Sequence, residues 1–467
     1  MKFTLEHFGA IRYAELEFGD FTIICGENNS GKTYVTYAVY GFMHFWSDVY
    51  QIDIDSNIIK KIKDTGFYNL ELSQVVKDAP FIIDKACQEY TNQLASVFST
   101  YDSKFERSVF KIDFSPDELT IDEREHTRSI HSTSAMTGLH CVKETGGRDL
   151  TITLFSEDSE GRDIPDFIVM QAISNALKAI VFSSIFPNTF IASAERTGAA
   201  IFRRELNFAR NKILDTMSKK DAEFDPFILF NQIKSDYPWP VDHNVDFARN
   251  LEDIFKYESE ILKKHRGILD IFSDILGGSY HVTDKDGLFF TPLNKNTGRK
   301  LPLSMDESSS SVRALLNIGF YLRHIAKAND MLVIDEPELN LHPSNQRKMA
   351  RLLASLVNCG IKVFITTHSD YILRELNNLL LLTGDRPHLA QIAKREGYKK
   401  AELIKPSRLR VYSTQSNHVK LPGDSKKTLN QTLVAIPIDD EIGIHSSSFD
   451  TVINDMNRIT DDIIFGG

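Results

Sequence analysis

The sequence predicts an α/β fold, with a mixed sheet flanked by helices. Three short apolar runs carry this prediction, and each has the length of a fully buried strand: residues 21–25, 331–334 and 362–366. The first run enters a glycine-rich loop and then a helical stretch over 32–46, and a helix over 344–357 joins the other two runs. Because these strands lie far apart along the chain, both ends of the sequence are expected in one domain.

The spacing of apolar side chains defines the other elements. Apolar residues three and four positions apart predict helices over 51–100, 166–182, 198–272 (broken near Pro226 and at 238–240), 310–326 and 449–459. Short or alternating apolar runs between turn residues predict strands at 3–6, 11–18, 109–112, 119–121, 150–154, 189–192 and after Gly277.

These elements predict a discontinuous domain. Residues 1–45 and 300–380 are expected to form one head, and 46–300 an inserted lobe of helices and strands whose helical part is about 198–272. Residues 381–467 are expected to be a mixed α/β extension.

Composition restricts the class of protein. The chain has 467 residues, 42% of them hydrophobic and 25% charged, as in ordinary globular proteins. Its four cysteines form no CxxC pair, which excludes zinc ribbons and hooks of the usual spacing. A net charge of −10 argues against a protein coated in nucleic acid. Without a signal peptide or a membrane-length apolar run, a cytoplasmic location and no membrane partner are expected.

Residues 26–33, GENNSGKT, match the phosphate-binding pattern GxxxxGK(S/T) in full. The glycines let successive backbone N–H groups surround a phosphate, and the N-terminus of the following helix adds partial positive charge. Lys32 is expected to reach the β and γ phosphates, and the Thr33 hydroxyl to hold Mg²⁺. The expected binding residues are Gly26, Asn28, Asn29, Ser30, Gly31, Lys32 and Thr33.

Polar residues follow both of the later apolar strands. Asp335, at the end of one strand, can bind the metal ion, and the adjacent Glu336 can orient and deprotonate an attacking water. His368, after the other strand, can sense the γ-phosphate or that water. Alone, such residues are usually caps or surface groups, but beside a phosphate-binding loop they predict nucleotide hydrolysis, with Glu336, His368 and Lys32 as catalytic residues.

The motifs GENNSGKT, DEPELNLHP (335–343) and TTHSDYIL (366–373) together resemble the ABC-type ATPase heads of the RecF, SMC and OLD group. The resemblance is strong over 1–45 and 300–380 and looser between them. It implies an ABC-type P-loop fold, ATP and Mg²⁺ as ligands, and His368 as the switch histidine. It also implies a head-to-tail dimer or higher homo-oligomer, in which residues 339–343 are the D-loop that contacts the other copy.

The group's signature segment, Ser-Gly-Gly in many members, corresponds to Ser309-Ser310-Ser311. By this resemblance Ser309 reaches the γ-phosphate held by a second copy, with a helix N-terminus behind it. Serines replace both glycines, and their Cβ atoms limit how closely the backbone approaches a phosphate, which implies slow turnover. The alternative interpretation is a serine-rich loop that caps a helix.

Another segment, 190–198, resembles the strand end "PAER" of RecF- and OLD-like ATPases. The resemblance implies that Glu195 or Arg196 contacts nucleotide or partner, and a structural ion pair is the alternative. Residues 46–300 lack the long heptad arm and CxxC hook of SMC proteins, which favours a compact RecF- or OLD-like lobe. The acidic cluster at 436–441 lacks the other parts of an OLD nuclease and is interpreted as a turn or cap.

ATPases of this form, with a lobe and no nuclease, resemble subunits of bacterial anti-phage systems such as Septu and PARIS. That resemblance implies a sensor or scaffold with a separate effector protein such as a nuclease. A RecF-like DNA-repair ATPase is the alternative, with nucleic acid as partner through basic runs at 203–220 and 394–410. A third hypothesis is an interaction module in which Ser310 and Ser311 abolish turnover.

Overall fold

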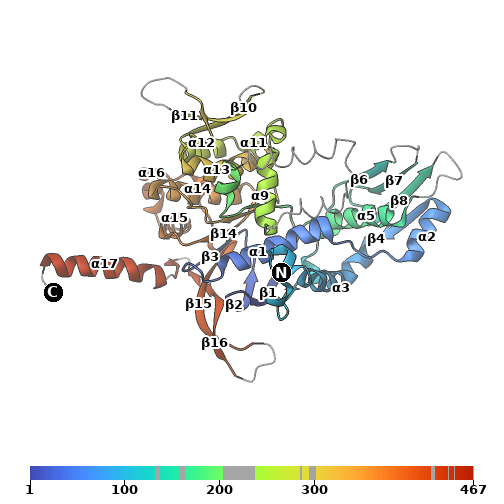
Figure 1. Cartoon of the computed structure of the whole chain (residues 1–467), viewed down its shortest axis with the longest axis horizontal. Coiled ribbons are helices and arrows are strands. Elements are labelled where there is room, and N and C mark those ends of the chain that lie inside the picture. The colour runs from blue at the N-terminus through green and yellow to red at the C-terminus, as the bar shows by residue number, and fades with distance from the viewer. Residues whose placement is uncertain are drawn as a thin grey trace, which may run out of the picture. The chain divides into compact units, whose positions relative to one another are not determined.

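The computed structural model in Figure 1 describes most of the chain: residues 1–131, 137–156, 164–202, 237–283, 287–293, 301–421, 426–439, 441–445 and 447–465. The chain divides into two compact units. The first contains residues 1–6, 41–94 and 107–189, and the second contains 7–40, 95–106 and 190–467. Among the described residues, each helix is too short or too polar to cross a lipid bilayer.

The first unit contains a four-stranded antiparallel sheet and two further paired strands. The sheet has the order β4 (Phe67–Glu71), β8 (Asp149–Ser156), β7 (Thr137–Lys143), β6 (His126–His131), and β1 (Lys2–Phe8) pairs with β5 (Val109–Asp113). Its longer helices are α2 (Ser56–Thr65), α3 (Leu72–Thr91) and α5 (Asp166–Leu177). The strands expected at 109–112 and 150–154 are confirmed as β5 and β8, and β6, β7 and β8 form a meander. The strand expected at 119–121 is wrong, because these residues follow a 3-10 turn at 116–118 and pair with no neighbour as a strand in the described structure.

The expectation of continuous helix over 51–100 is wrong at β4. Gly66 ends α2 with a φ of 76°, a left-handed conformation that glycine adopts without strain. The chain then runs as a strand because Phe67 to Glu71 pair in register with the 149–153 end of β8. Long-range pairing therefore overrides helical spacing here.

The second unit contains the mixed sheet that the sequence predicts. Its strand order is β2 (Ile11–Glu17), β16 (Thr428–Ile436), β15 (Leu409–Val419), β3 (Phe21–Cys25), β14 (Lys362–Thr367), β13 (Met331–Asp335), β9 (Thr189–Ala192). Strands β13, β14, β3 and β15 are parallel, and β15 pairs antiparallel with β16. Figure 1 shows β3, β14 and β15 close together. The carboxyl ends of parallel strands meet at one sheet edge, which positions the loops that follow them.

Helices pack on this sheet through one large core. The main ones are α1 (Lys32–His44), α12 (Gly267–Leu276), α13 (Ser310–Phe320), α14 (Pro343–Asn358) and α15 (Asp370–Leu381). Side chains of the last four share a buried cluster with β3, β13, β14 and β15. Other elements of this unit are α6 (Arg196–Ile201), α9 (Trp239–Arg249), α10 (Leu251–Ile254), α11 (Glu260–Lys264), α16 (Leu389–Arg395), α17 (Ser447–Phe465), β10 (Gly278–Thr283), β11 (Gly287–Pro292), β12 (Leu303–Ser304), β17 (Ile438–Asp439) and β18 (Gly443–Ile444).

The compact units do not follow the segment boundaries expected from the sequence. Strands β15 and β16 lie inside the sheet, between β3 and β2, although residues 381–467 were expected as an extension. Their place follows from Leu409 and Val411, whose buried side chains join the core while their backbone pairs with β3. The basic run at 203–220 and the break near Pro226 lie outside the described residues.

Candidate functional site

The phosphate-binding loop begins where β3 ends, and its glycines are required by the backbone. Gly26 has a φ of 146° and Gly31 a φ of 97°, both in the region that L-residues with side chains rarely adopt. A Cβ at Gly26 would overlap the Thr414 hydroxyl, and one at Gly31 would lie 2.7 Å from Ile11. Asn29 also has positive φ, 60°. The loop conformation therefore depends on glycine at both positions.

Gly26→Ala is expected to weaken ATP binding by more than about tenfold, because the loop must shift away from Thr414. Gly198→Ala is the matched control, since a Cβ there meets open space and the residue lies in helix α6. Titration with a fluorescent ATP analogue measures both. Equal affinity of the two variants would contradict the glycine requirement.

Lys32 opens helix α1 and turns its ammonium back into the loop. Its side chain is buried, and Nζ donates to the carbonyl oxygens of Gly26 at 3.0 Å and Glu27 at 2.7 Å. Burial lowers the pKa of Lys32, and the carboxylates of Glu336 and Asp335 oppose that change. A cation is thus fixed within the glycine-rich loop, where phosphate oxygens would be bound.

Thr33 and Asp335, which are 302 positions apart in the sequence, meet in the structure. The Thr33 hydroxyl donates to Asp335 Oδ2 at 3.1 Å, and the Thr366 hydroxyl donates to Oδ1. Asp335 is 1% exposed, and its pKa is raised to about 6, chiefly by burial, with Thr366 and Thr33 opposing the rise. Residues from β13, β14 and α1 therefore share one buried polar centre.

This centre fits a hard divalent cation bound partly through phosphate. A carboxylate and a hydroxyl are the oxygen ligands that Mg²⁺ takes in nucleotide sites. No group of three or more His, Cys, Asp or Glu within the described part of the chain could hold a metal ion by itself. A cation beside Thr33 and Asp335 would therefore take its other ligands from phosphate oxygens and water.

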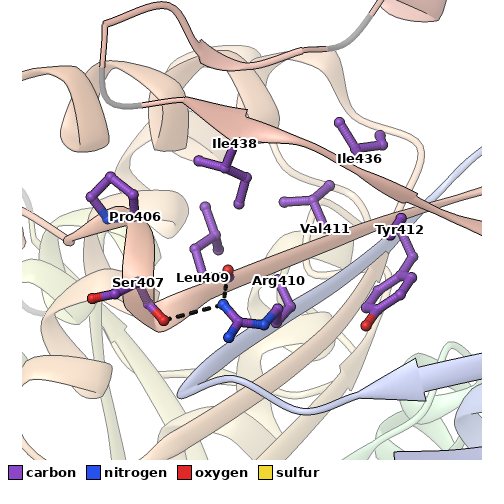
Figure 2. A pocket seen from close by; sticks show the side chains of 9 residues that line it. Pro406, Ser407, Leu409, Arg410, Val411, Tyr412, Ile436 and Ile438 are labelled. Carbon is purple, nitrogen blue, oxygen red and sulfur yellow. Dashed lines mark hydrogen bonds between the residues drawn. The ribbon is translucent and has the colours of Figure 1, made fainter.

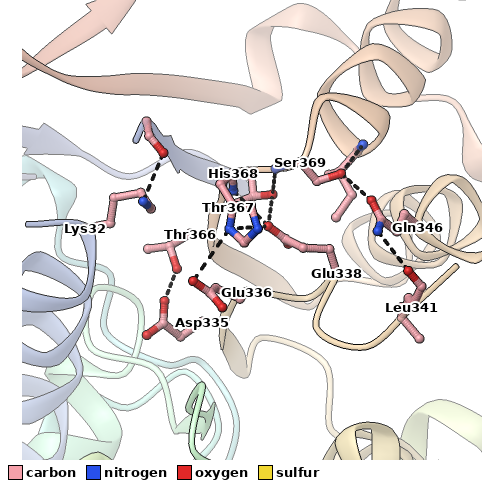
Figure 3. Close-up of polar contacts among 12 residues, drawn as sticks. Lys32, Asp335, Glu336, Glu338, Leu341, Gln346, Thr366, Thr367, His368 and Ser369 are labelled. Carbon is pink, nitrogen blue, oxygen red and sulfur yellow. Dashed lines mark hydrogen bonds and ion pairs between the residues drawn. The ribbon is translucent and has the colours of Figure 1, made fainter. Parts of the chain in front are cut away.

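Glu336 and His368 lie next to this centre at the ends of adjacent strands (Figure 3). His368 Nδ1 is 3.6 Å from Glu336 Oε1 and 3.3 Å from Glu338 Oε1. The His368 side chain is 45% exposed, so a ligand can reach it. Glu336 has a φ of 54°, an unusual conformation that turns the chain directly after the buried strand.

The sequence left the role of Arg196 open. Within the described part of the chain, Arg196 bonds backbone carbonyls rather than a carboxylate, and it lies outside the 26–33 loop. Arg196 is 1% exposed, and its guanidinium donates to four backbone carbonyls: Ser193, Ala314, Asp335 and Glu336, at 2.7–2.8 Å. Burial lowers its pKa to about 10. Arg196 thus joins the end of β13 to α13. Glu195 instead accepts from the Tyr37 hydroxyl of α1 at 2.7 Å.

Thr414 and Gln431 of strands β15 and β16 support the phosphate-binding loop, and sequence analysis missed both. The Thr414 and Ser30 hydroxyls are 2.6 Å apart, and Gln431 donates to the Ser30 carbonyl at 3.4 Å. The apolar residues Leu409 and Val411, which flank Arg410, give only a weak sequence signal for β15, and the buried stretch continues through the polar Ser413 and Thr414.

Ser309 lies at the N-terminus of α13 and makes its hydrogen bonds there. Its exposed hydroxyl accepts from Val312 N at 3.4 Å and lies 2.8 Å from Ser311 Oγ. The structure therefore brings residues 26–33, 335–336 and 368 together, and it places Ser309 as the cap of a separate helix.

A pocket of about 290 Å³ lies outside these motifs (Figure 2). It is lined by residues 406–407, 409–412, 435–436 and 438. None of the predicted site residues lines it, so it is separate from the polar centre at Thr33 and Asp335.

Comparison with known proteins places this arrangement in a family. A family model described as an AAA ATPase domain matches residues 1–373, which is most of the chain. None of the curated proteins matches the sequence.

Three solved structures of SMC heads align with most of this chain, at low sequence identity and low TM-score. The SMC head bound to the C-winged helix domain of ScpA has 12% identity, covers 94% of this chain and 97% of its own, and gives a TM-score of 0.35. The head with an extended coiled coil, bound to the C-terminal domain of ScpA from Pyrococcus furiosus, has 12% identity, 98% coverage of both chains and a TM-score of 0.31. The head from Thermotoga maritima has 8% identity, covers 94% of this chain and 98% of its own, and gives a TM-score of 0.30.

The predicted fold class and the predicted ATPase activity are both confirmed. A mixed sheet with flanking helices carries a P-loop after β3 and carboxylates after β13. The chain belongs to the AAA ATPase domain family and is an ATPase.

Proposed function

We propose that this ATPase binds ATP with Mg²⁺ between the 26–33 loop and the ends of β13 and β14, and hydrolyses it slowly. The observation that carries the proposal is the 3.1 Å hydrogen bond between Thr33 and Asp335. Lys32 would bind the β and γ phosphates, and Glu336 would take the proton of the attacking water. His368 would contact the γ-phosphate. Bound Mg²⁺ would neutralise charge on the phosphates.

We further propose that two copies assemble head to tail, with Ser309 of one facing Lys32 of the other. The exposed N-terminus of α13 supports this, because free N–H groups at a helix start favour an anion. The proposed D-loop, residues 339–343, leads into α14: Asn340 has a φ of 59°, and the His342 side chain caps the helix. A site composed of Ser309 from one copy and Lys32 from the other would make assembly depend on ATP.

Ser309→Arg is expected to abolish an ATP-stabilised dimer, because a bulky side chain would separate the α13 N-terminus from the second copy's nucleotide. The measurement is molar mass by light scattering with ATP, in a Glu336→Gln background that keeps ATP bound. Ser56→Arg, at an exposed serine that begins α2, is the control and should still dimerise. A Glu336→Gln protein that stays monomeric with ATP would refute the composite site.

In the cell, we propose a sensor or scaffold role in anti-phage defence with a separate effector such as a nuclease. The resemblance to Septu- and PARIS-type ATPases supports it. The acidic cluster at 436–441 also supports a separate nuclease, because it behaves as a turn and not as a nuclease site. Asp439 accepts the backbone N–H groups of Glu441 and Ile442, as a turn residue does. Plaque counts in cells carrying the gene with its neighbours should show protection that Lys32→Ala removes. ATP-dependent, salt-sensitive DNA binding without protection would favour the RecF-like alternative.

A further inference from the structure

Glu338 lies two residues after the proposed catalytic base, and its carboxylate is buried. Figure 3 shows it pointing toward the loop after β14. Its Oε1 accepts from the Thr367 hydroxyl at 2.8 Å and from His368 N at 2.8 Å. The same oxygen lies 3.3 Å from His368 Nδ1. One carboxylate oxygen thus accepts from two donors on successive residues and also faces a His368 ring nitrogen.

Two carboxylates lie near the same edge of the His368 ring. Nδ1 is 3.3 Å from Glu338 and 3.6 Å from Glu336. The Glu338 side chain is 4% exposed and that of Glu336 is 28% exposed. An interaction with the buried Glu338 carboxylate is less screened by solvent. Two backbone hydrogen bonds fix the turn over 336–341, from Leu339 N to Glu336 O and from Leu341 N to Glu338 O. Glu338 is therefore the better placed acceptor.

We propose that Glu338 is a positioning residue that holds His368 through Nδ1 and so keeps the ring away from Glu336. A ring held at Nδ1 presents Nε2, its other nitrogen, for a ligand. The Glu336 carboxylate, which is 28% exposed, would then remain accessible to water. Without Glu338, the imidazole would turn to the second carboxylate at that edge, which is the proposed base, Glu336. The inference rests on the proposed roles of Glu336 and His368.

The test is a double-mutant cycle in steady-state ATP hydrolysis. Glu338→Ala should lower kcat by between about ten- and a hundredfold through misplacement of His368 and Glu336. ATP affinity should change by less than about twofold, because Glu338 bonds Thr367 and His368, whereas Lys32 and the 26–33 loop would supply most of the phosphate binding. Glu338→Gln keeps an oxygen acceptor and should restore part of kcat. In a His368→Ala background, Glu338→Ala should have no further effect.

Glu375→Ala is the control for losing a buried carboxylate. Glu375 of α15 pairs with Arg347 and Arg351 and touches no proposed site residue. It should lower the unfolding midpoint while kcat stays within about twofold of wild type.

The outcomes separate this inference from the proposed function. If His368→Ala leaves kcat unchanged, the proposed role of His368 is wrong and the inference falls with it. If His368→Ala slows hydrolysis but Glu338→Ala slows it by the same factor in both backgrounds, Glu338 acts independently. The inference alone is then overturned. An equal loss of kcat and ATP affinity in Glu338→Ala would also overturn it.

Discussion

Glu336→Gln is expected to lower kcat for ATP hydrolysis by about 10²- to 10⁴-fold, with ATP affinity within about twofold of wild type. Glutamine has the same shape but cannot take a proton from water. The backbone bonds that fix this residue, from its N–H to the Thr366 carbonyl and from Arg196 to its own carbonyl, do not involve the side chain. The variant should therefore fold normally and hold ATP without cleaving it.

Lys32→Ala provides the contrast. Lys32 donates into the loop rather than to the strand ends, so its loss should weaken ATP binding itself. Phosphate release and nucleotide titration on both variants distinguish the two roles. Near-normal turnover in Glu336→Gln would mean that another group activates the water, and the role proposed for Glu336 would be wrong.

The parts of the site that the sequence predicted share one property: each is local. The loop at 26–33 combines a short apolar strand, glycines with positive φ and a helix start, all within a few residues. Asp335 and His368 follow apolar runs, and parallel strands bring their ends together. Their meeting with Thr33 required only that β3 join the same sheet, which the apolar runs also predicted.

The parts that the sequence did not predict depend on contacts across the fold. Thr414 lies beside Ser30 because β15 enters the sheet next to β3, and no local pattern specifies that neighbour. Arg196 binds carbonyl oxygens, which every residue has, so no sequence motif marks its partners. Ser309 matched a motif by position, yet its observed hydrogen bonds are those of an ordinary helix cap.

Arg196→Ala is expected to destabilise the protein by at least about 3 kcal/mol, since the four carbonyl acceptors of this buried guanidinium would lose their donors. Two of these carbonyls belong to Asp335 and Glu336, and a third lies on α13. The same change should therefore lower kcat as well, by letting the end of β13 move relative to α13. Arg196→Lys should recover only part of both losses, because an ammonium has three donors and no planar fork.

Thermal unfolding and phosphate release measure the two effects, with Arg395→Ala as the control. Arg395 is 73% exposed and pairs with its neighbour Glu396, so its loss should change stability by less than about 0.5 kcal/mol. A wild-type unfolding midpoint in Arg196→Ala would show that the carbonyls find other donors. If stability fell while the kcat of the remaining folded protein was unchanged, Arg196 would support the core without positioning the catalytic carboxylates. A joint loss is the expected result, because one guanidinium bonds both helix α13 and the residues that would bind metal and water.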